Sequence, residues 1–390
     1  MDFSLTDEDE AFRADIRDFL KRHHPGKAPR GADAVLQWQR DWAALLSDEG
    51  YAAPGWPKEF GGMELPLPQQ LVYHEEMTLA RVPGHPSANS FIVGPTLIKH
   101  GTPEQHDRFL RRLLRADDLW CQGWSEPDAG SDLPSLKTRA VRDGDDYVVT
   151  GQKIWTSASV NADWMFALVR TGTPESRQHG LTYLLIDMRS PGLTVRPITD
   201  MSGGSHFSEV FFDEVSVPVG NRIGEENGGW SIARTSIGHE RSTAFIAQDI
   251  RYRRIVRELI ELAQENGASK DPLVRQQLAQ LEIEVRLLGL NGMRSLSTVL
   301  KGGEPGPESS ISRLFHGQFE KRLHEVAVDV TGAYGLLDRK DPHSVQRGRW
   351  VWGMLRTRAS TIGAGTAEIQ RNTIGERVLG LPYEPGSATP

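Results

Sequence analysis

Between residues 118 and 227 the sequence changes from helical to strand patterning, and this change constrains the fold more than any other feature. Short runs rich in Val, Ile, Phe and Tyr follow one another here: DYVVTG, DWMFALVRT, LTYLLIDM, LTVRPIT and EVFFDEVSVP. Turn residues separate them. Short strands at such regular spacing are typical of a compact antiparallel sheet. The glycine-rich run GNRIGEENGGW then ends the strand pattern.

Helical periodicity flanks the strand region on both sides. In residues 3–115, Thr6 and the acidic residues after it resemble a helix N-cap and first turn, and apolar residues then recur at helical spacing. From Ser231 onward, apolar residues mark two long helices, one through 278–299 and another through 311–330. We therefore predict an α+β multidomain protein with an N-terminal helical domain (1–117), a middle antiparallel β domain (118–227) and a C-terminal helical bundle (228–390).

Length and charge narrow the classes of function. A chain of 390 residues exceeds a usual single core, and its net charge of −7 provides no basic surplus for nucleic acid or an anionic membrane. No apolar run reaches about 18 residues, so we expect no membrane insertion. Cys121 is the only cysteine, which excludes an internal disulfide and a thiolate metal cluster. We expect a cytoplasmic protein without a metal site, and no nucleophilic role for Cys121.

Two segments of the β region carry the strongest functional signal: GWSEPDAGSD at 123–132 and GQKIWTS at 151–157. The first is a loop crowded with Gly, Pro and short polar side chains, so its N–H groups and hydroxyls can turn toward a ligand. The second continues a strand and places Trp155 beside hydroxyl side chains. Either segment alone could be an ordinary hairpin loop with a core tryptophan. Together they suit a flat ring with polar edges, such as a flavin.

At this separation the two segments strongly resemble the acyl-CoA dehydrogenase family, in which a Glu-Pro-x-x-Gly-Ser-Asp loop and a Gly-Gln-Lys-x-Trp strand wrap the FAD ring. GAGTAEIQRNTIGERVLGLP, at 363–382, is similar to the family's C-terminal signature. The likeness covers essentially the whole chain. It implies FAD-dependent dehydrogenation of an acyl-CoA to the 2-enoyl-CoA: a base removes the α-proton and a hydride passes from the β-carbon to the flavin.

The catalytic base departs from the commonest family pattern. In many members it is a Glu directly before the Gly-Thr of the C-terminal signature, and here that position is Ala364, which cannot take a proton. A subset of the family, including the isovaleryl-CoA type, carries a Glu directly before an Arg on the first C-terminal helix, and Glu240-Arg241 matches it.

The residues around Glu240 support that choice. On a helix through this segment Glu240 shares a small apolar face with Ala233 and Ile237, where desolvation would raise the pKa of a carboxylate. We predict Glu240 as the base. The alternative is a structural ion pair between Glu240 and a buried Arg.

The resemblance also implies the ligand contacts. The residues matching the family's FAD contacts are Gln122, Gly123, Ser125, Trp155, Ser157, Thr366 and Glu368. The residues matching its acyl-CoA contacts are Ser131, Arg241 and Ala364, whose backbone N–H, with a flavin ribityl hydroxyl, would hold the thioester oxygen. Ser131 could instead be a turn hydroxyl, and Arg241 a charge on a helix face. For Glu126 and Asp132 we expect structural roles as loop ties.

Two further departures concern assembly. Family members that form homotetramers usually carry an Arg-x-Thr-Phe-Gly run whose Arg reaches the FAD pyrophosphate of a neighbouring subunit, and ENGASKDP, at 265–272, has no Arg. The family's Gln-x-x-Gly-Gly segment begins with Asp329 here and has Ala333 for its second Gly. An Asp beside a pyrophosphate is electrostatically unfavourable. One alternative is a homo-oligomer, a dimer or tetramer, that uses other cations such as Arg275 or Arg313.

The other alternative is a heterotetramer in which a sister subunit supplies the missing contacts, as in some actinobacterial dehydrogenases acting on steroid side-chain thioesters. The leading interpretation is an acyl-CoA dehydrogenase that passes electrons to electron-transfer flavoprotein or a similar acceptor. A flavin oxidase or monooxygenase on the same fold, or a non-catalytic subunit of a heteromeric dehydrogenase, remains open. The sequence does not reveal the acyl group.

Overall fold

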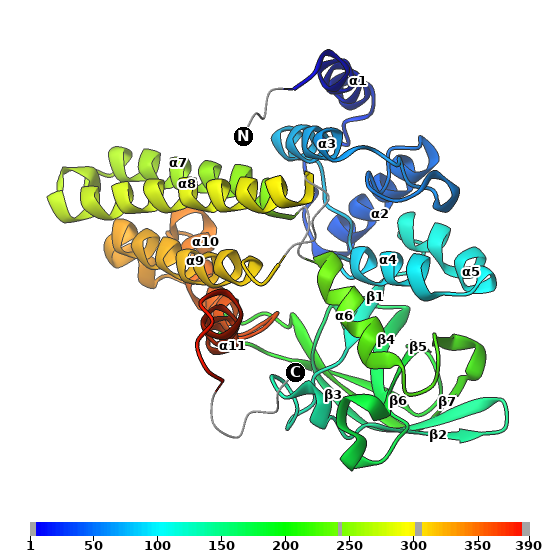
Figure 1. The fold of residues 1–390 in the computed structure, drawn as a ribbon. Coiled ribbons are helices and arrows are strands. Elements are labelled where there is room, and N and C mark those ends of the chain that lie inside the picture. Colours follow the sequence, from blue (N-terminus) through cyan, green and yellow to red (C-terminus); the bar gives the residue numbers. More distant parts are fainter. Residues whose placement is uncertain (1–4, 241–243, 301–305, 384–390) are drawn as a thin grey trace. The chain divides into compact units, whose positions relative to one another are not determined.

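The computed structural model (Figure 1) describes residues 5–240, 244–300 and 306–383. The chain divides into two compact units. The sheet-containing unit comprises the described residues up to Asp200 together with Gly204–Glu240, and the bundle unit comprises the described residues after Glu240 together with Met201–Gly203. The domain boundaries at 117 and 227 stay predictions.

The sheet-containing unit begins with helices, as predicted: α1 (Asp7–His23), α2 (Ala32–Asp48), α3 (Leu67–Ala80), α4 (Ser90–His100) and α5 (Pro103–Leu114). The N-cap predicted at Thr6 is confirmed. Its side chain accepts a hydrogen bond from the Asp9 N–H, while the Asp9 carboxylate accepts one from the Thr6 N–H. This reciprocal capping box satisfies two amides that a helix start leaves unpaired.

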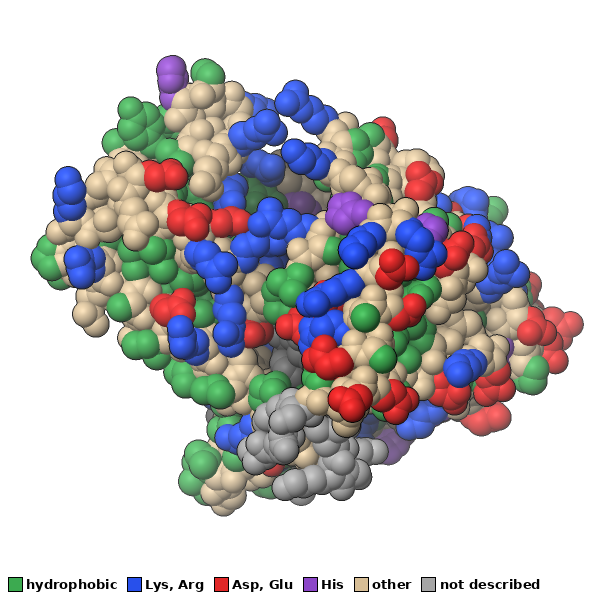
Figure 2. Space-filling view, turned by 90° about the horizontal axis from the view of Figure 1, so that it is seen from above, with side chains coloured by type: hydrophobic (Ala, Val, Ile, Leu, Met, Phe, Trp, Pro, Cys, Tyr) green, Lys and Arg blue, Asp and Glu red, His purple; other side chains and the backbone are tan. Residues whose placement is uncertain are grey.

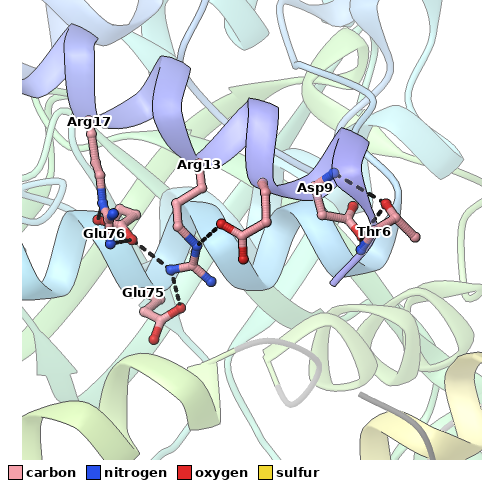
Figure 3. A network of polar contacts seen from close by, with 7 residues as sticks. Thr6, Asp9, Arg13, Arg17, Glu75 and Glu76 are labelled. Atoms are coloured by element: carbon pink, nitrogen blue, oxygen red, sulfur yellow. Dashed lines mark hydrogen bonds and ion pairs between the residues drawn. The ribbon is translucent and has the colours of Figure 1, made fainter. Parts of the chain in front are cut away.

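An ion-pair network joins α1 to α3 (Figure 3). The Glu76 carboxylate, only 5% exposed, lies 2.6 Å from Arg13 Nη1 and 2.9 Å from Arg17 Nε. Arg13 also pairs with the more exposed Glu75 at 2.8 Å. Burial by itself would raise the pKa of Glu76, but the hydrogen bonds from the two guanidinium groups outweigh it and lower that pKa. The network therefore holds α1 against α3 through charges that are paired, as buried charges require.

The strands form one eight-stranded sheet in the order β6-β7-β3-β2-β4-β5-β8, with β1 paired to β4. Their bounds are β1 (Trp120–Gly123), β2 (Arg139–Asp143), β3 (Asp146–Ser157), β4 (Trp164–Arg170), β5 (Leu181–Asp187), β6 (Leu193–Ile198), β7 (Phe207–Pro218) and β8 (Arg222–Ile223). The five predicted strand runs are β3 to β7. Strands β1, β2 and β8 were not predicted, because they have only two to five residues each and show too little alternation of apolar and polar residues.

Most strand pairs are antiparallel, as predicted, but β1 runs parallel to β4, from Trp120↔Trp164 to Gly123↔Ala167. Strand β2 also meets β4 in parallel, at the single pair Arg139↔Arg170. Helix α6 (Gly229–Glu240) then packs against α4 and β5 within the same unit. It therefore shares the apolar core formed by α4, α5, β1, β4 and β5.

The bundle unit contains α7 (Ala244–Glu265), α8 (Pro272–Leu300), α9 (Ser309–Thr331), α10 (Arg349–Arg356) and α11 (Ala367–Thr373). Helices α8 and α9 confirm the two long helices predicted from apolar spacing. Leu259, Leu281 and Leu323, from three different helices, are fully buried in one core. No described helix combines the length and apolar character needed to cross a bilayer. On the face shown in Figure 2, basic and acidic side chains are interspersed.

A buried ion pair ties the loop at 123–132 to the sheet. The Lys153 side chain is fully buried, and its Nζ donates to Glu126 Oε1 at 2.7 Å. The Glu126 carboxylate also accepts the backbone N–H groups of Lys137 and Thr138, at 2.6 and 2.9 Å. Burial lowers the pKa of Lys153 to about 8. Burial raises the pKa of Glu126, but Lys153 and the other donors outweigh it and lower that pKa. The loop-tie role predicted for Glu126 is confirmed.

We predict that Lys153→Met destabilises the protein by about 3 kcal/mol at neutral pH, because it leaves the Glu126 carboxylate buried without its cation. The double variant Lys153→Met/Glu126→Gln should recover most of that loss, since no buried charge remains. In the single variant the folded-state pKa of Glu126 rises above its unfolded value. Its destabilisation should therefore shrink as the pH falls from 8 to 5. Urea unfolding of the three proteins at several pH values measures this; a double variant no more stable than the single one would contradict it.

Candidate functional site

The structure brings together the two segments that carried the functional signal. Gln122 and Gly123 end β1, and Ser125 lies two residues after it. Trp155 and Ser157 are among the last three residues of β3. The Ile154 N–H donates to the Ser125 carbonyl oxygen at 2.9 Å, so the end of β1 and the end of β3 lie side by side. Residues that are distant in sequence and predicted to contact one ligand therefore lie at neighbouring strand ends.

A β-bulge presents Trp155. The ladder between β3 and β7 passes from Lys153↔Val210 to Thr156↔Ser208, leaving Trp155 out of register. Trp155 has φ of 59°, which is uncommon for a bulky residue, and such strain concentrates at functional sites. Its indole is 56% exposed and meets the edge of Phe207 with ring centroids 6.0 Å apart. Bulges commonly re-aim a side chain, and here the bulge holds a large aromatic ring at the surface.

The accessible groups at these two strand ends are an aromatic ring and two hydroxyls. Trp155 and Ser157 are exposed and Ser125 is half-buried. Their neighbours in sequence point elsewhere: Thr156 is buried, and Trp124 packs against Phe166 and Tyr183 in the core. The predicted flavin can therefore meet the Trp155 indole and the two serine side chains.

The loop after Ser125 is held at its far end. Asp132 pairs with Arg177 at 2.7 Å, which confirms the loop-tie role predicted for Asp132. Ser131, the predicted acyl-CoA contact, is exposed beside it. Both residues stand at the surface of the sheet-containing unit, where Ser131 is accessible to a solvent-borne ligand.

Helix α6 carries the predicted base at its end. Glu240 is the last residue of α6, and its side chain lies outside the described structure, as does all of Arg241. Along the helix Ala233 is buried and Ile237 half-buried, in keeping with the apolar face predicted there. The buried Ser236 lies on the same helix, one turn before Glu240, and nothing in the sequence indicated its burial.

In the bundle unit, the loop before α11 keeps an unusual backbone. Ala364 has φ of 54° and Gly365 has φ of 89°, both in the left-handed region. Arg313 donates to the carbonyl oxygen of Gly363, directly before them. A non-glycine residue in this region is strained, so the neighbouring contacts must hold it. The backbone N–H of Ala364 is thus presented by a defined loop although the residue has no carboxylate.

The two predicted FAD contacts in the bundle unit lie at the start of α11. Thr366 is the N-cap, and its Oγ1 accepts from the Ile369 N–H at 3.2 Å, which leaves the hydroxyl hydrogen able to donate. Glu368 is exposed in the first turn. Their contact with FAD stays a prediction.

The two departures that concern assembly lie next to each other. The segment 265–272 joins α7 to α8, and Asn266 Nδ2 in it donates to the carbonyl oxygen of Val330 at 2.9 Å. Asp329, beside Val330, is exposed near the end of α9. The one basic residue in the sequence of this segment is Lys270, which is exposed. This corner of the bundle unit therefore presents a carboxylate where the family pattern has a glutamine.

Other candidate features do not compete with this site. A cavity of about 780 Å³ lies beside β2, but none of the residues predicted to bind FAD or acyl-CoA lines it. Cys121 is fully buried, and burial raises the pKa of its thiol, which disfavours the reactive thiolate. Within the described ranges, no three His, Cys, Asp or Glu side chains are grouped to hold a metal ion.

Comparison with known proteins identifies the family. The chain matches the model of the acyl-CoA dehydrogenase N-terminal domain at residues 6–117, of its middle domain at 121–215 and of its C-terminal domain at 227–379. It is 37% identical over 401 residues to the acyl-CoA dehydrogenase IpdE1 of Mycolicibacterium smegmatis, covering 97% of this chain and 99% of that protein.

Solved structures agree. The ChsE4-ChsE5 complex from Mycobacterium tuberculosis contains a chain with 32% identity and a TM-score of 0.82, covering 98% of this chain and 100% of that one. The Tcur3481-Tcur3483 steroid ACAD contains one with 28% identity and a TM-score of 0.83, at the same coverage. The protein therefore belongs to the acyl-CoA dehydrogenase family, whose members are FAD-dependent oxidoreductases acting on acyl-CoA.

Proposed function

We propose that this chain dehydrogenates an acyl-CoA thioester between its α- and β-carbons, with Glu240 as the base that removes the α-proton. The observation that carries the proposal is Ala364: the loop keeps a left-handed backbone at the usual base position but has no group to accept a proton. The carboxylate must then come from elsewhere, and Glu240 at the end of α6 is the residue that matches a known family variant.

In this mechanism the chain contributes three functions. Glu240 accepts the α-proton, and its carboxylate is neutralised as it does so. The backbone N–H of Ala364 donates a hydrogen bond to the thioester oxygen, where negative charge develops as the proton leaves. Ser131 and Arg241 bind the CoA portion of the substrate. FAD, when bound, supplies the acceptor for the hydride that leaves the β-carbon.

The proposed FAD contacts are the residues that match those of the family. Gln122, Gly123 and Ser125 contact the ring edge, and Trp155 and Ser157 flank its face. The exposed indole of Trp155 supports this assignment. Thr366 and Glu368 match the contacts of the C-terminal signature.

We propose a bulky, steroid-derived acyl-CoA as the substrate and electron-transfer flavoprotein or a similar protein as the acceptor. The substrate class is supported by the likeness to the Tcur3481-Tcur3483 steroid ACAD. We propose a cytoplasmic location, which the single, reduced Cys121 supports.

We further propose a heteromeric assembly with a sister dehydrogenase subunit. The exposed Asp329 and the absence of Arg from 265–272 support it, since a pyrophosphate binds poorly without a cation partner. The two similar solved structures are themselves complexes of two differently named chains. An apolar stripe on α8 is available for a partner: Ile283, Leu287 and Leu290 follow helical spacing and are 52%, 42% and 65% exposed.

Replacing the base tests the central assignment. Glu240→Gln should slow flavin reduction by acyl-CoA about 10³-fold while leaving the visible flavin spectrum unchanged, because it removes the proton acceptor and preserves the side chain's shape. Glu225→Gln, at a highly exposed carboxylate of the same unit, serves as the control and should react normally. Anaerobic stopped-flow bleaching at the flavin band measures both. Reduction of the Gln variant at the unmodified rate would sink the assignment, and hydrogen peroxide accumulation in air would favour an oxidase.

The aromatic platform is tested by Trp155→Ala. Loss of the indole exposes the ring to water, and we expect FAD to bind about tenfold more weakly, with Trp155→Phe intermediate. Trp38→Ala, whose indole instead donates to the Pro25 carbonyl oxygen, should bind FAD normally. Fluorescence titration of apoprotein with FAD gives the three dissociation constants. Equal constants for Trp155→Ala and the unmodified protein would remove Trp155 from the site.

The assembly is tested by FAD content. The purified chain alone should retain less than one FAD per chain after dialysis, and co-expression with a sister subunit should restore both FAD and activity. Asp329→Gln should raise FAD retention of the lone chain, because it removes the repulsive carboxylate. Asp338→Asn, a nearby carboxylate outside the motif, is the control. Full FAD occupancy in a homo-oligomer would refute the heteromeric proposal and direct attention to Arg275 and Arg313.

A further inference from the structure

Three hydroxyl groups meet inside the otherwise apolar core of the sheet-containing unit. Thr96 comes from α4, Tyr183 from β5 and Ser236 from α6, and all three residues are fully buried. Thr96 Oγ1 lies 2.8 Å from Ser236 Oγ, and the Tyr183 hydroxyl lies 3.3 Å from the same Ser236 oxygen. The residues around them form the largely aromatic and aliphatic cluster of this unit.

The three hydroxyls can form one chain with a single direction. Tyr183 donates to Ser236, Ser236 donates to Thr96, and Thr96 donates to the carbonyl oxygen of Ile92 at 2.8 Å. Burial raises the pKa of Tyr183, which keeps its phenol protonated and able to donate. The carbonyl oxygen of Ile232, one turn earlier in α6, lies 3.2 Å from Ser236 Oγ and is a second acceptor for its hydrogen. Buried hydroxyls are costly when unpaired, so a shift of α6 that separated Ser236 from the Tyr183 and Thr96 hydroxyls would be unfavourable.

A second contact holds the start of α6. A Cβ on Gly229 would lie 2.7 Å from the carbonyl carbon of Thr182, so only glycine allows the helix to approach the β5 backbone here. The Asn227 N–H, just before the helix, donates to Thr182 Oγ1 at 2.8 Å. Gly229 and Ser236 are about two turns apart. Two contacts at that separation define both the rotation of α6 about its axis and its translation along it.

We propose that the hydroxyl chain of Tyr183, Ser236 and Thr96 positions α6 and, through it, the base at residue 240. Ser236 and Glu240 are separated by four residues, so they lie on the same face of the helix one turn apart. The inference rests on the proposed function, in which Glu240 is the base. The three hydroxyl residues act through the helix and are positioning residues, without contact to the substrate.

Tyr183 also connects α6 to the strand end where the flavin is proposed to bind. Its ring meets that of Trp124 edge to face, with centroids 6.5 Å apart, and stacks on Phe166 at 6.0 Å. Trp124 directly precedes Ser125. The helix that carries the base and the loop that carries the proposed flavin contact are therefore packed on one tyrosine, which relates their positions within a single unit.

The test compares Ser236→Ala and Tyr183→Phe with Tyr73→Phe. Tyr73 is a buried tyrosine of α3 whose hydroxyl donates to the carbonyl oxygen of Tyr51 at 2.8 Å, in a core cluster that contains no residue of α6. We expect flavin reduction to slow about 10- to 100-fold in Ser236→Ala and about tenfold in Tyr183→Phe, because small misplacement of a reacting group is costly. Tyr73→Phe should react within about twofold of the unmodified rate.

A kinetic isotope effect distinguishes a positioning role from a merely structural one. The substrate is an acyl-CoA that bleaches the flavin, deuterated at the α-carbon or at the β-carbon. The isotope effect from the α-position should increase in Ser236→Ala and Tyr183→Phe. The effect from the β-position should not. FAD content and the dissociation constant for acyl-CoA should stay unchanged. Amide hydrogen exchange of residues 229–240, measured without substrate, should quicken in Ser236→Ala and stay unchanged in Tyr73→Phe.

The outcomes separate this inference from the proposed function. Normal reduction in Ser236→Ala and Tyr183→Phe, with an inactive Glu240→Gln, overturns the positioning role and leaves the base assignment standing. A slow Ser236→Ala that also loses FAD, or that keeps an unchanged α-isotope effect, overturns it as well. An active Glu240→Gln overturns both. If Ser236→Ala does not fold, Thr96→Val removes the next link of the chain and replaces it in the comparison.

Discussion

The ammonium group of Lys153, buried without any exposed surface, determines where the proposed cofactor site can form. Its partner Glu126 collects three donors, from Lys153, Lys137 and Thr138, and so connects the loop after β1 to β3 and to the segment before β2. A buried charge persists only where it is paired. The loop therefore cannot move away from the sheet without exposing or isolating a charge, and it is held beside the end of β3.

The hydroxyl chain at α6 applies the same physical constraint with neutral groups. Apolar contacts alone are non-directional and tolerate small shifts of a helix, whereas hydrogen bonds among Thr96, Tyr183 and Ser236 are satisfied in one arrangement. The ion pairs of Glu76 with Arg13 and Arg17 likewise hold α1 in one position against α3 (Figure 3). In the loop after β1 and in α6, a few buried polar atoms specify the position of an element that carries proposed site residues.

In the bundle unit, two positions of the family pattern carry different side chains. The loop around Ala364 retains a strained backbone, held in part by Arg313 at Gly363, although the usual carboxylate is missing. Near the end of α9, Asp329 stands where the family pattern has a glutamine. A strained loop without a carboxylate and an exposed Asp329 agree with the proposed heteromeric assembly, in which a partner subunit would supply part of the cofactor binding. FAD content therefore discriminates between the assemblies.

The sequence by itself determined the order of helical, strand and helical regions, the capped start of α1 and the identity of the family, because periodicity, capping chemistry and short motifs are local. It also indicated that Glu126 and Asp132 tie the loop. It did not reveal the parallel pairing of β1 with β4, the exposure of Trp155 by a bulge, or the roles of Lys153 and Ser236. These features depend on which distant residues become neighbours in the fold. From sequence alone a lysine such as Lys153 is expected at the surface, and only the folded chain shows that it is buried against Glu126. Likewise Ser236 can hold its helix in place only because two other buried hydroxyls lie within hydrogen-bonding distance of it.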